Sequence, residues 1–245
     1  MRKILYHGSL EIISTPMYGQ GKVYNDYGQG FYCTESLELA KEWSCAERED
    51  GYVNQYEMDE TGLLILNLME KHYSVLHWLA ILMKYRKIRL SSAVMKRGRE
   101  WLLEHFLPDV DGYDVVIGYR ADDSYFSFAR AFVNNEISLE QLSYDGVIEA
   151  LCHRTLPVWA VQWHPERLGK LGEQYVLKSQ KAFQAIHFLS YEGVDSVEYY
   201  VKRRARDEQA RNAYRKKVEE DDIDGIYMRD LIRGEVSAED ERLWD

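Results

Sequence analysis

The residues most clearly suited to a chemical role are a histidine and a glycine that follow the first apolar segment of the chain. Ile4 to Tyr6 predicts a short strand, and His7-Gly8-Ser9 is typical of a polar break at its end. A glycine after a strand lets the backbone approach a flat ligand closely, and the histidine side chain can hydrogen-bond a ribose hydroxyl. A lone His-Gly after a strand is more often a plain turn, so this pair needs support from the rest of the sequence.

A second segment supplies that support, because its glycines precede two aromatic residues. Gly28-Gln29-Gly30-Phe31-Tyr32 is followed eleven residues later by Trp43, in a helix predicted from Leu37 to about Ala46. Together with His7-Gly8-Ser9, these segments resemble the diphtheria-toxin-like ADP-ribosyltransferases, the superfamily of the poly(ADP-ribose) polymerases. The alternative is that Tyr32 and Trp43 are ordinary core aromatics on a strand and a helix.

The resemblance implies that the chain uses NAD as a substrate and cleaves its nicotinamide–ribose bond without a metal. Cleavage builds positive charge on the sugar. A site must therefore clamp the nicotinamide amide, hold the ribose hydroxyls and place a polar or anionic group near the developing cation. By the family pattern, His7 holds the ribose, Gly8 and Ser9 form the amide clamp, and Tyr32 and Trp43 sandwich the nicotinamide ring.

The third position of the family pattern opens a late strand and is a glutamate in the most active members. The best match is Gly172 to Leu177, where Gln174 takes that position and Glu173 stands one residue before it. Because strand side chains alternate between faces, a shift of one residue decides which of the two faces the site. Glu173 would supply a carboxylate for the cation. Gln174 would hold the hydroxyl but carries no charge. It therefore favours slow transfer of a single ADP-ribose, or a site in which another carboxylate stabilises the cation.

Asp122 and Asp123 are candidates for that other carboxylate, although two adjacent acids after a strand more often form a turn and a helix cap. They lie in a Gly-x-x-Ala-Asp-Asp segment at 118–123. With the segments above, it resembles an uncharacterised bacterial family of transferase-like proteins from about Lys3 to about Leu189. This second resemblance implies the toxin of a toxin–antitoxin module, with a cognate antitoxin as partner.

The elements that must position these residues indicate an α+β fold. The resemblance implies an ADP-ribosyltransferase-like split sheet, mixed or antiparallel, in residues 1–193. Residues 70–107 predict a helical insertion of at least two helices, and residues 194–245 a charged, mainly helical C-terminal extension. Further strands are expected at Val53–Met58, Leu63–Leu68, Asp114–Tyr119, Pro157–Trp163 and Gly172–Leu177, and a helix at Lys181–Leu189.

Composition excludes several classes of protein. The net charge of −10 argues against a general nucleic-acid coat protein, although it allows a local basic patch. Three cysteines without metal spacing, and an N-terminus without a signal-peptide apolar region, predict a cytoplasmic protein that has no membrane partner. Basic residues from Lys202 to Lys217 could contact nucleic acid, but a solvated helix face is the preferred interpretation.

These observations favour an NAD-dependent mono-ADP-ribosyltransferase acting on an unidentified macromolecular acceptor, either protein or nucleic acid. Two alternatives stay open. One is an NAD glycohydrolase on the same fold, which passes ADP-ribose to water. The other is a catalytically inactive module that binds NAD or a partner, which the missing glutamate favours.

Overall fold

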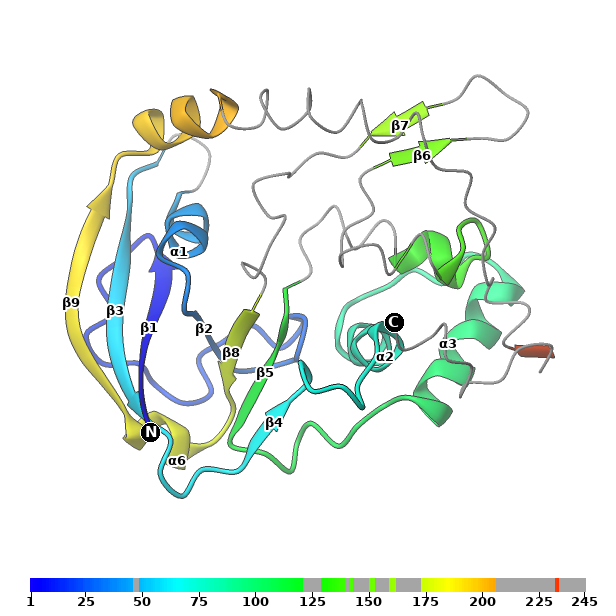
Figure 1. Cartoon of the computed structure of the whole chain (residues 1–245), viewed down its shortest axis with the longest axis horizontal. Coiled ribbons are helices and arrows are strands. Elements are labelled where there is room, and N and C mark those ends of the chain that lie inside the picture. Colours follow the sequence, from blue (N-terminus) through cyan, green and yellow to red (C-terminus); the bar gives the residue numbers. More distant parts are fainter. Residues whose placement is uncertain are drawn as a thin grey trace. The chain divides into compact units, whose positions relative to one another are not determined.

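The chain forms a mixed α+β fold in two compact units (Figure 1). The computed structural model describes residues 1–45, 49–120, 129–139, 142, 150–152, 159–161, 173–205 and 232–233. Unit 1 comprises Met1–Met69, Asp109–Arg120 and Lys170–Ala205. Unit 2 comprises Glu70–Pro108, Ala121–Gly169 and Arg206–Asp245. All the residues of the family pattern whose side chains are described belong to unit 1.

Unit 1 is built on a seven-stranded sheet in the order β4-β5-β8-β2-β1-β3-β9. The short β4 and β5 run parallel, and every other neighbouring pair is antiparallel. The strands are β1 Arg2–Ser9, β2 Phe31–Thr34, β3 Gly51–Asp59, β4 Ile65–Asn67, β5 Val115–Tyr119, β8 Glu173–Leu177 and β9 Ile186–Val194. This arrangement is the α+β architecture expected from the sequence.

Within the seven-stranded sheet, β1 and β2 are the neighbouring strands with the fewest paired residues. These strands share one pair, Tyr6 opposite Thr34, whereas β1 pairs with β3 along its whole length. Four strands (β4, β5, β8 and β2) therefore form one half of the sheet and three (β1, β3 and β9) form the other. Beyond Tyr6 the pairing of β1 with β2 ends, and we call this place, beside which His7, Gly8 and Ser9 lie, the opening.

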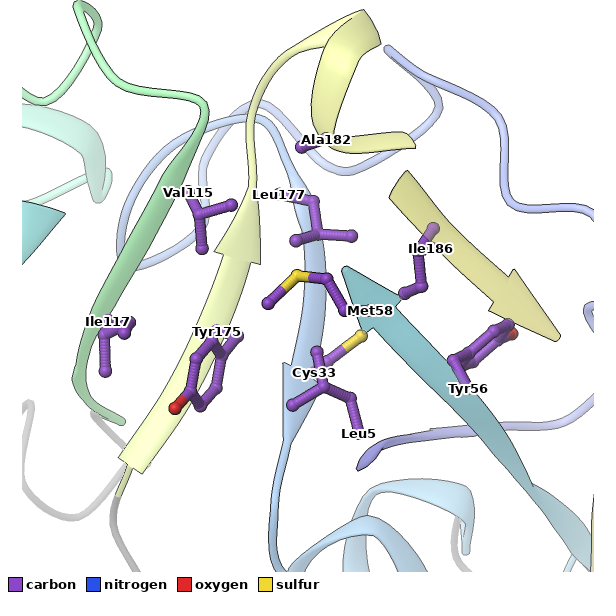
Figure 2. Close-up of a cluster of buried hydrophobic side chains, with 10 residues drawn as sticks. All are labelled: Leu5, Cys33, Tyr56, Met58, Val115, Ile117, Tyr175, Leu177, Ala182 and Ile186. Atoms are coloured by element: carbon purple, nitrogen blue, oxygen red, sulfur yellow. The ribbon is translucent and has the colours of Figure 1, made fainter. Parts of the chain in front are cut away.

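Among the described residues, α6 lies on one face of the sheet, whereas α1 and the helical residues 196–205 lie on the other, and we name the faces after α6 and α1. The α6 face carries the buried cluster shown in Figure 2, which includes Leu5, Cys33, Tyr56 and Tyr175 and reaches Ala182 of α6 (Gln180–Ala185). On the opposite α1 face, Tyr6 and Val53 pack near Ala40 of α1 (Leu37–Ser44). Because side chains alternate along a strand, Gly8, Tyr32 and Gln174 also belong to the α1 face.

Serine residues cap several of the described helices. Ser36 starts α1 by accepting a hydrogen bond from the Leu39 backbone N–H, and the helix ends at Ser44, two residues before the predicted end. In unit 2, Ser74 caps α2 (Val75–Tyr85) and Ser92 caps α3 (Ala93–His105), which confirms two helices within 70–107. Unit 2 also contains the antiparallel pair β6 (Ala150–Cys152) and β7 (Trp159–Val161), and residues 129–133 are helical.

Two local predictions are wrong. The helix expected at Lys181–Leu189 ends at Ala185, and Ile186 begins β9. Pairing with β3 outweighs the helical pattern of this segment, and Leu189, expected to face inward, is 48% exposed. His7-Gly8-Ser9 is also not a break, because these residues continue β1 opposite Asn54, Val53 and Tyr52.

A polar network on the α6 face links the two halves of the sheet. The Tyr175 hydroxyl donates to Glu35 at 2.6 Å, Lys3 donates to the Tyr175 oxygen, and Lys3 lies 3.0 Å from Glu35. Burial opposes ionisation of Glu35, but these hydrogen bonds outweigh it and hold the pKa of Glu35 below its usual value. Burial and the bond to Glu35 raise the pKa of Tyr175 to about 12.

Replacing Glu35 with glutamine is expected to destabilise the protein at neutral pH and to have a smaller effect near pH 3. The folded-state pKa of Glu35 is depressed. Its carboxylate therefore stabilises the fold above the unfolded value of 4.5, and this contribution is lost as the pH falls through the folded value. Urea unfolding of wild type and Glu35→Gln at both pH values measures this, with Glu11→Gln on an exposed loop residue as control. An equal loss at pH 3 would contradict the expectation.

Candidate functional site

His7 bridges the two halves of the sheet at the opening between β1 and β2. Its Nδ1 lies 2.6 Å from the Tyr32 carbonyl oxygen, and its ring packs on Phe31 with centroids 4.4 Å apart. Burial lowers the pKa of His7, and the bond to Tyr32 only partly offsets this. Since a carbonyl only accepts, Nδ1 carries the proton of the neutral ring, and Nε2 is left as an acceptor for a hydroxyl donor.

Gly8 allows α1 to lie directly on β1. A Cβ at this position would overlap the Ala40 carbonyl oxygen and lie 2.6 Å from the Ser44 nitrogen and 2.9 Å from the Trp43 Cβ. Continued antiparallel register beyond Tyr6 and Thr34 would place Gly8 opposite Tyr32, but the strands separate there. The backbone of Gly8 thus lies directly against Trp43, the predicted aromatic of α1.

Ser9 takes part in a structural network whose centre is Asn54, a residue that sequence reasoning missed. Asn54 is fully buried and its Nδ2 donates to Ser9 Oγ at 2.9 Å, while its Oδ1 accepts from the Ile13 N–H at 2.9 Å. Ser9 Oγ in turn donates to the Glu11 carbonyl at 2.7 Å. Ser9 therefore holds the loop after β1. The available signal for Asn54 was a polar residue in line with the apolar positions Tyr56 and Met58 of an alternating strand.

Tyr32 is anchored to the loop that precedes β2. Its hydroxyl donates to the Gly28 carbonyl at 2.6 Å and accepts from the Tyr27 N–H at 3.0 Å. Gly28 adopts a φ of 75°, a left-handed conformation that glycine takes without strain. Tyr27, a second aromatic that sequence reasoning missed, is fully buried beside Gly118, and its hydroxyl donates to the Tyr119 carbonyl at 2.6 Å.

Gln174 lies on the α1 face, on the same side of the sheet as Tyr32. It pairs with Thr34 on β2 and Gly118 on β5 and is only 2% exposed. Its Nε2 has no hydrogen-bond partner within the part of the chain that the structure describes. Glu173 precedes it in β8 opposite Tyr119, and the Glu173 side chain lies outside the described residues. A buried amide without an acceptor is costly and points to a missing partner.

Trp43 extends from Gly8 toward the end of β5. The Arg120 guanidinium lies 5.3 Å from the centre of its ring, and Arg120 Nη1 is 2.7 Å from Glu42 Oε1. The indole Nε1 of Trp43 is buried and, among the described residues, has no partner. The Trp43 ring and the Arg120 side chain together link Gly8 of β1 to the residue after β5, and β2 and β8 lie between these two strands in the sheet. Arg120 and Glu42 were not predicted, and only their charge could have signalled them.

The structure thus brings Gly8, Tyr32, Trp43 and Gln174 to one face of the sheet, whereas His7 reaches the same opening from the α6 side. Two buried N–H donors, Gln174 Nε2 and Trp43 Nε1, have no acceptor among the described residues. A planar cation, the Arg120 guanidinium, already lies over the Trp43 ring. This set of groups can bind a flat, cationic ring that carries carbonyl or hydroxyl oxygens.

Several other predicted features can be placed only in part. Asp122 and Asp123 lie outside the described residues, as does the basic segment beyond Ala205. Cys33 is buried among apolar side chains on the α6 face, as expected, and Cys45 is also a buried free thiol. In the described ranges, no helix is long and apolar enough to cross a membrane, and no three His, Cys, Asp or Glu residues gather as metal ligands.

The fold is that of an α+β protein whose mixed sheet consists of two halves joined by a single residue pair between β1 and β2. One face of this sheet carries buried aromatic and amide groups beside the opening. The chain belongs to the family described as protein of unknown function (DUF3990), which matches residues 3–188. That range covers every candidate residue from His7 to Gln174.

A short segment also matches a curated enzyme. It is 49% identical over 45 residues to an aminodeoxychorismate synthase of Streptomyces griseus, and the match covers 18% of this chain and 6% of the synthase. The match therefore spans a small fraction of that relative's length, and the activity in its name is a property of the synthase.

Proposed function

We propose that this protein binds NAD at the opening between β1 and β2 and transfers its ADP-ribose to a macromolecular acceptor. The observation that carries the proposal is a pair of buried donors on the α1 face, Gln174 Nε2 and Trp43 Nε1, for which the described part of the chain offers no acceptor. The carboxamide oxygen and ribose hydroxyls of NAD are acceptors of the kind these donors require. The nicotinamide ring of NAD is a flat cation, which suits the Trp43 ring that Arg120 now covers.

The described residues suggest a role for each candidate. The backbone of Gly8, at the point where β1 separates from β2, would orient the carboxamide, and Tyr32 and Trp43 would flank the ring. His7 Nε2 would accept from a ribose hydroxyl, because Nδ1 is bound to Tyr32. Gln174 would hold a ribose hydroxyl through its amide. The bond that breaks is the glycosidic bond, whose electrons leave with nicotinamide while the acceptor bonds to the ribose carbon.

The neutral Gln174 favours a second candidate, a module that binds NAD without turnover. An amide offers no charge to stabilise an oxocarbenium ion, so chemistry at this position is expected to be slow. Binding and turnover must therefore be measured separately.

Replacing Gln174 with glutamate is expected to speed nicotinamide release by about tenfold or more, because a carboxylate would stabilise the developing cation. Chromatography measures release, and calorimetry measures NAD binding. Gln174→Leu should weaken binding by about tenfold through loss of one hydrogen bond to the ligand. Gln55→Glu, the same change on the neighbouring half-sheet, is the control.

The outcomes separate the candidates. Radiolabel that appears on a macromolecule supports transfer, and free ADP-ribose identifies a glycohydrolase. Saturable binding without release by wild type or Gln174→Glu identifies the binding module. The absence of NAD binding by the wild type, or binding unchanged by both Trp43→Ala and Gln174→Leu, would show that the site is misassigned.

A further inference from the structure

Unit 2 contains the longest segment of the chain without an acidic residue. From Lys71 to Arg99 there is no aspartate or glutamate, although the chain has 41 of them in 245 residues. Eight basic residues lie within these 29 positions: Lys71, Lys84, Arg86, Lys87, Arg89, Lys96, Arg97 and Arg99. In a protein with a net charge of −10, such a segregated positive segment is the local basic patch that the overall charge leaves possible.

The segment forms α2, the connection after it and the first half of α3. Arg89 in the connection, and Lys96 and Arg97 on α3, are exposed. Among the described residues, none of these three side chains makes a hydrogen bond or ion pair with a carboxylate. The first acidic residue, Glu100, comes only in the second half of α3. Three cations within nine positions of the chain are therefore available to an anionic partner.

Aromatic side chains continue the same surface of α3. Arg97, Trp101 and His105 are spaced at four-residue intervals, which places them on one face of the helix. The Trp101 and His105 rings are stacked with centroids 4.8 Å apart, and His105 is exposed. Cations followed by stacked aromatic rings suit a strand of phosphates with unpaired bases, because phosphates pair with the cations and bases stack on the rings. An acidic polypeptide would use only the cations.

We infer that this surface of unit 2, formed by Arg89, Lys96, Arg97, Trp101 and His105, binds single-stranded nucleic acid. The arginines add bidentate contacts to phosphate oxygens, which lysine cannot make. The inference does not rest on NAD chemistry, and binding is measured without NAD. It differs from the sequence prediction for Lys202 to Lys217, which places a basic cluster in another part of the chain.

Fluorescence anisotropy of the full chain with labelled 20-nucleotide single-stranded DNA and RNA tests the inference. We expect affinity to fall as salt rises, with a slope of about 0.7 per phosphate contact. The triple variant R89E/K96E/R97E should bind at least about tenfold more weakly at 0.1 M salt, with a slope reduced by about two. Trp101→Ala should weaken binding by roughly tenfold without changing the slope, because stacking releases no counterions.

The matched control is K202E/R203E/R204E, which changes the net charge equally at the other basic cluster. It should alter affinity far less than the first triple variant. Circular dichroism and thermal unfolding establish that each variant is folded. The inference is overturned if wild type does not bind at 0.05 M salt, or if the control alone loses binding. Competition by polyglutamate as strong as by nucleic acid would overturn it as well.

Discussion

Replacing Gly8 with alanine is expected to lower the free energy of unfolding by about 3 kcal/mol and to abolish NAD binding. The added Cβ would overlap the Ala40 carbonyl oxygen and lie 2.6 Å from the Ser44 nitrogen. Both are backbone atoms of α1, so no side-chain rotation can relieve the clash. Either α1 moves away from β1 or β1 distorts where it separates from β2.

The loss of binding follows from the same displacement. The Cβ of Trp43 would lie 2.9 Å from the new methyl group, so the indole ring would move together with α1. Urea unfolding measures stability, and calorimetry at a temperature where the variant is still folded measures NAD binding. If stability falls while NAD binding is retained, Trp43 does not contribute to the site.

Gly193→Ala is the matched control. Gly193 lies on β9 of the same sheet, and a Cβ at this position would meet no atom within 4 Å. The change should therefore be neutral or slightly stabilising, because alanine loses less backbone entropy on folding than glycine. A loss as large as that at Gly8 would mean that the sheet tolerates no added methyl group, and that the contact with α1 is not the cause.

Replacing Asn54 with leucine is expected to destabilise the protein by about 3 kcal/mol. The two side chains have the same branched arrangement of four non-hydrogen atoms, so most of the cost comes from polar groups left without partners. Asn54 Nδ2 donates to Ser9 Oγ at 2.9 Å and to the His7 carbonyl at 3.3 Å. Its Oδ1 accepts the Ile13 N–H at 2.9 Å, and all these bonds are part-buried.

The loop after β1 should loosen in the same variant, because Asn54 joins it to β3. Hydrogen exchange at the Ile13 N–H measures this directly, and protection there should fall more than at the centre of β3. Gln55→Leu is the control, since Gln55 is half-buried on the same strand and has one exposed bond, from Ser190 at 3.4 Å. Equal effects of the two leucine variants would contradict the role of Asn54.

Local patterns were sufficient for most of the secondary structure. The Ser36 cap predicted where α1 starts, and apolar spacing with a basic break predicted two helices within 70–107, because both signals depend on neighbouring residues alone. Alternating apolar residues predicted β3, and the aromatic and aliphatic residues at 175–177 predicted β8. The segment at Ile186–Leu189 failed because its partner strand, β3, lies more than a hundred residues earlier in the chain.

The candidate site depends more strongly on long-range contacts. The motifs around His7 and Tyr32 were visible as spaced residues, but their spacing could not show that β1 and β2 share a single pair. Nor could it choose between Glu173 and Gln174, since a strand pattern allows either register. The pairing of Gln174 with Thr34 and Gly118 places its side chain on the face that Tyr32 and Gly8 share.

The sequence by itself determined the residue types beside the opening, the α+β class and the serine-capped helices, because these depend on composition and on near neighbours. Only the tertiary structure decided which face each residue occupies, that Gly8 is needed for contact with α1, and that Asn54, Tyr27 and Arg120 belong to the same region. Strand register and helix packing join residues far apart in the chain, and a single sequence does not record those contacts.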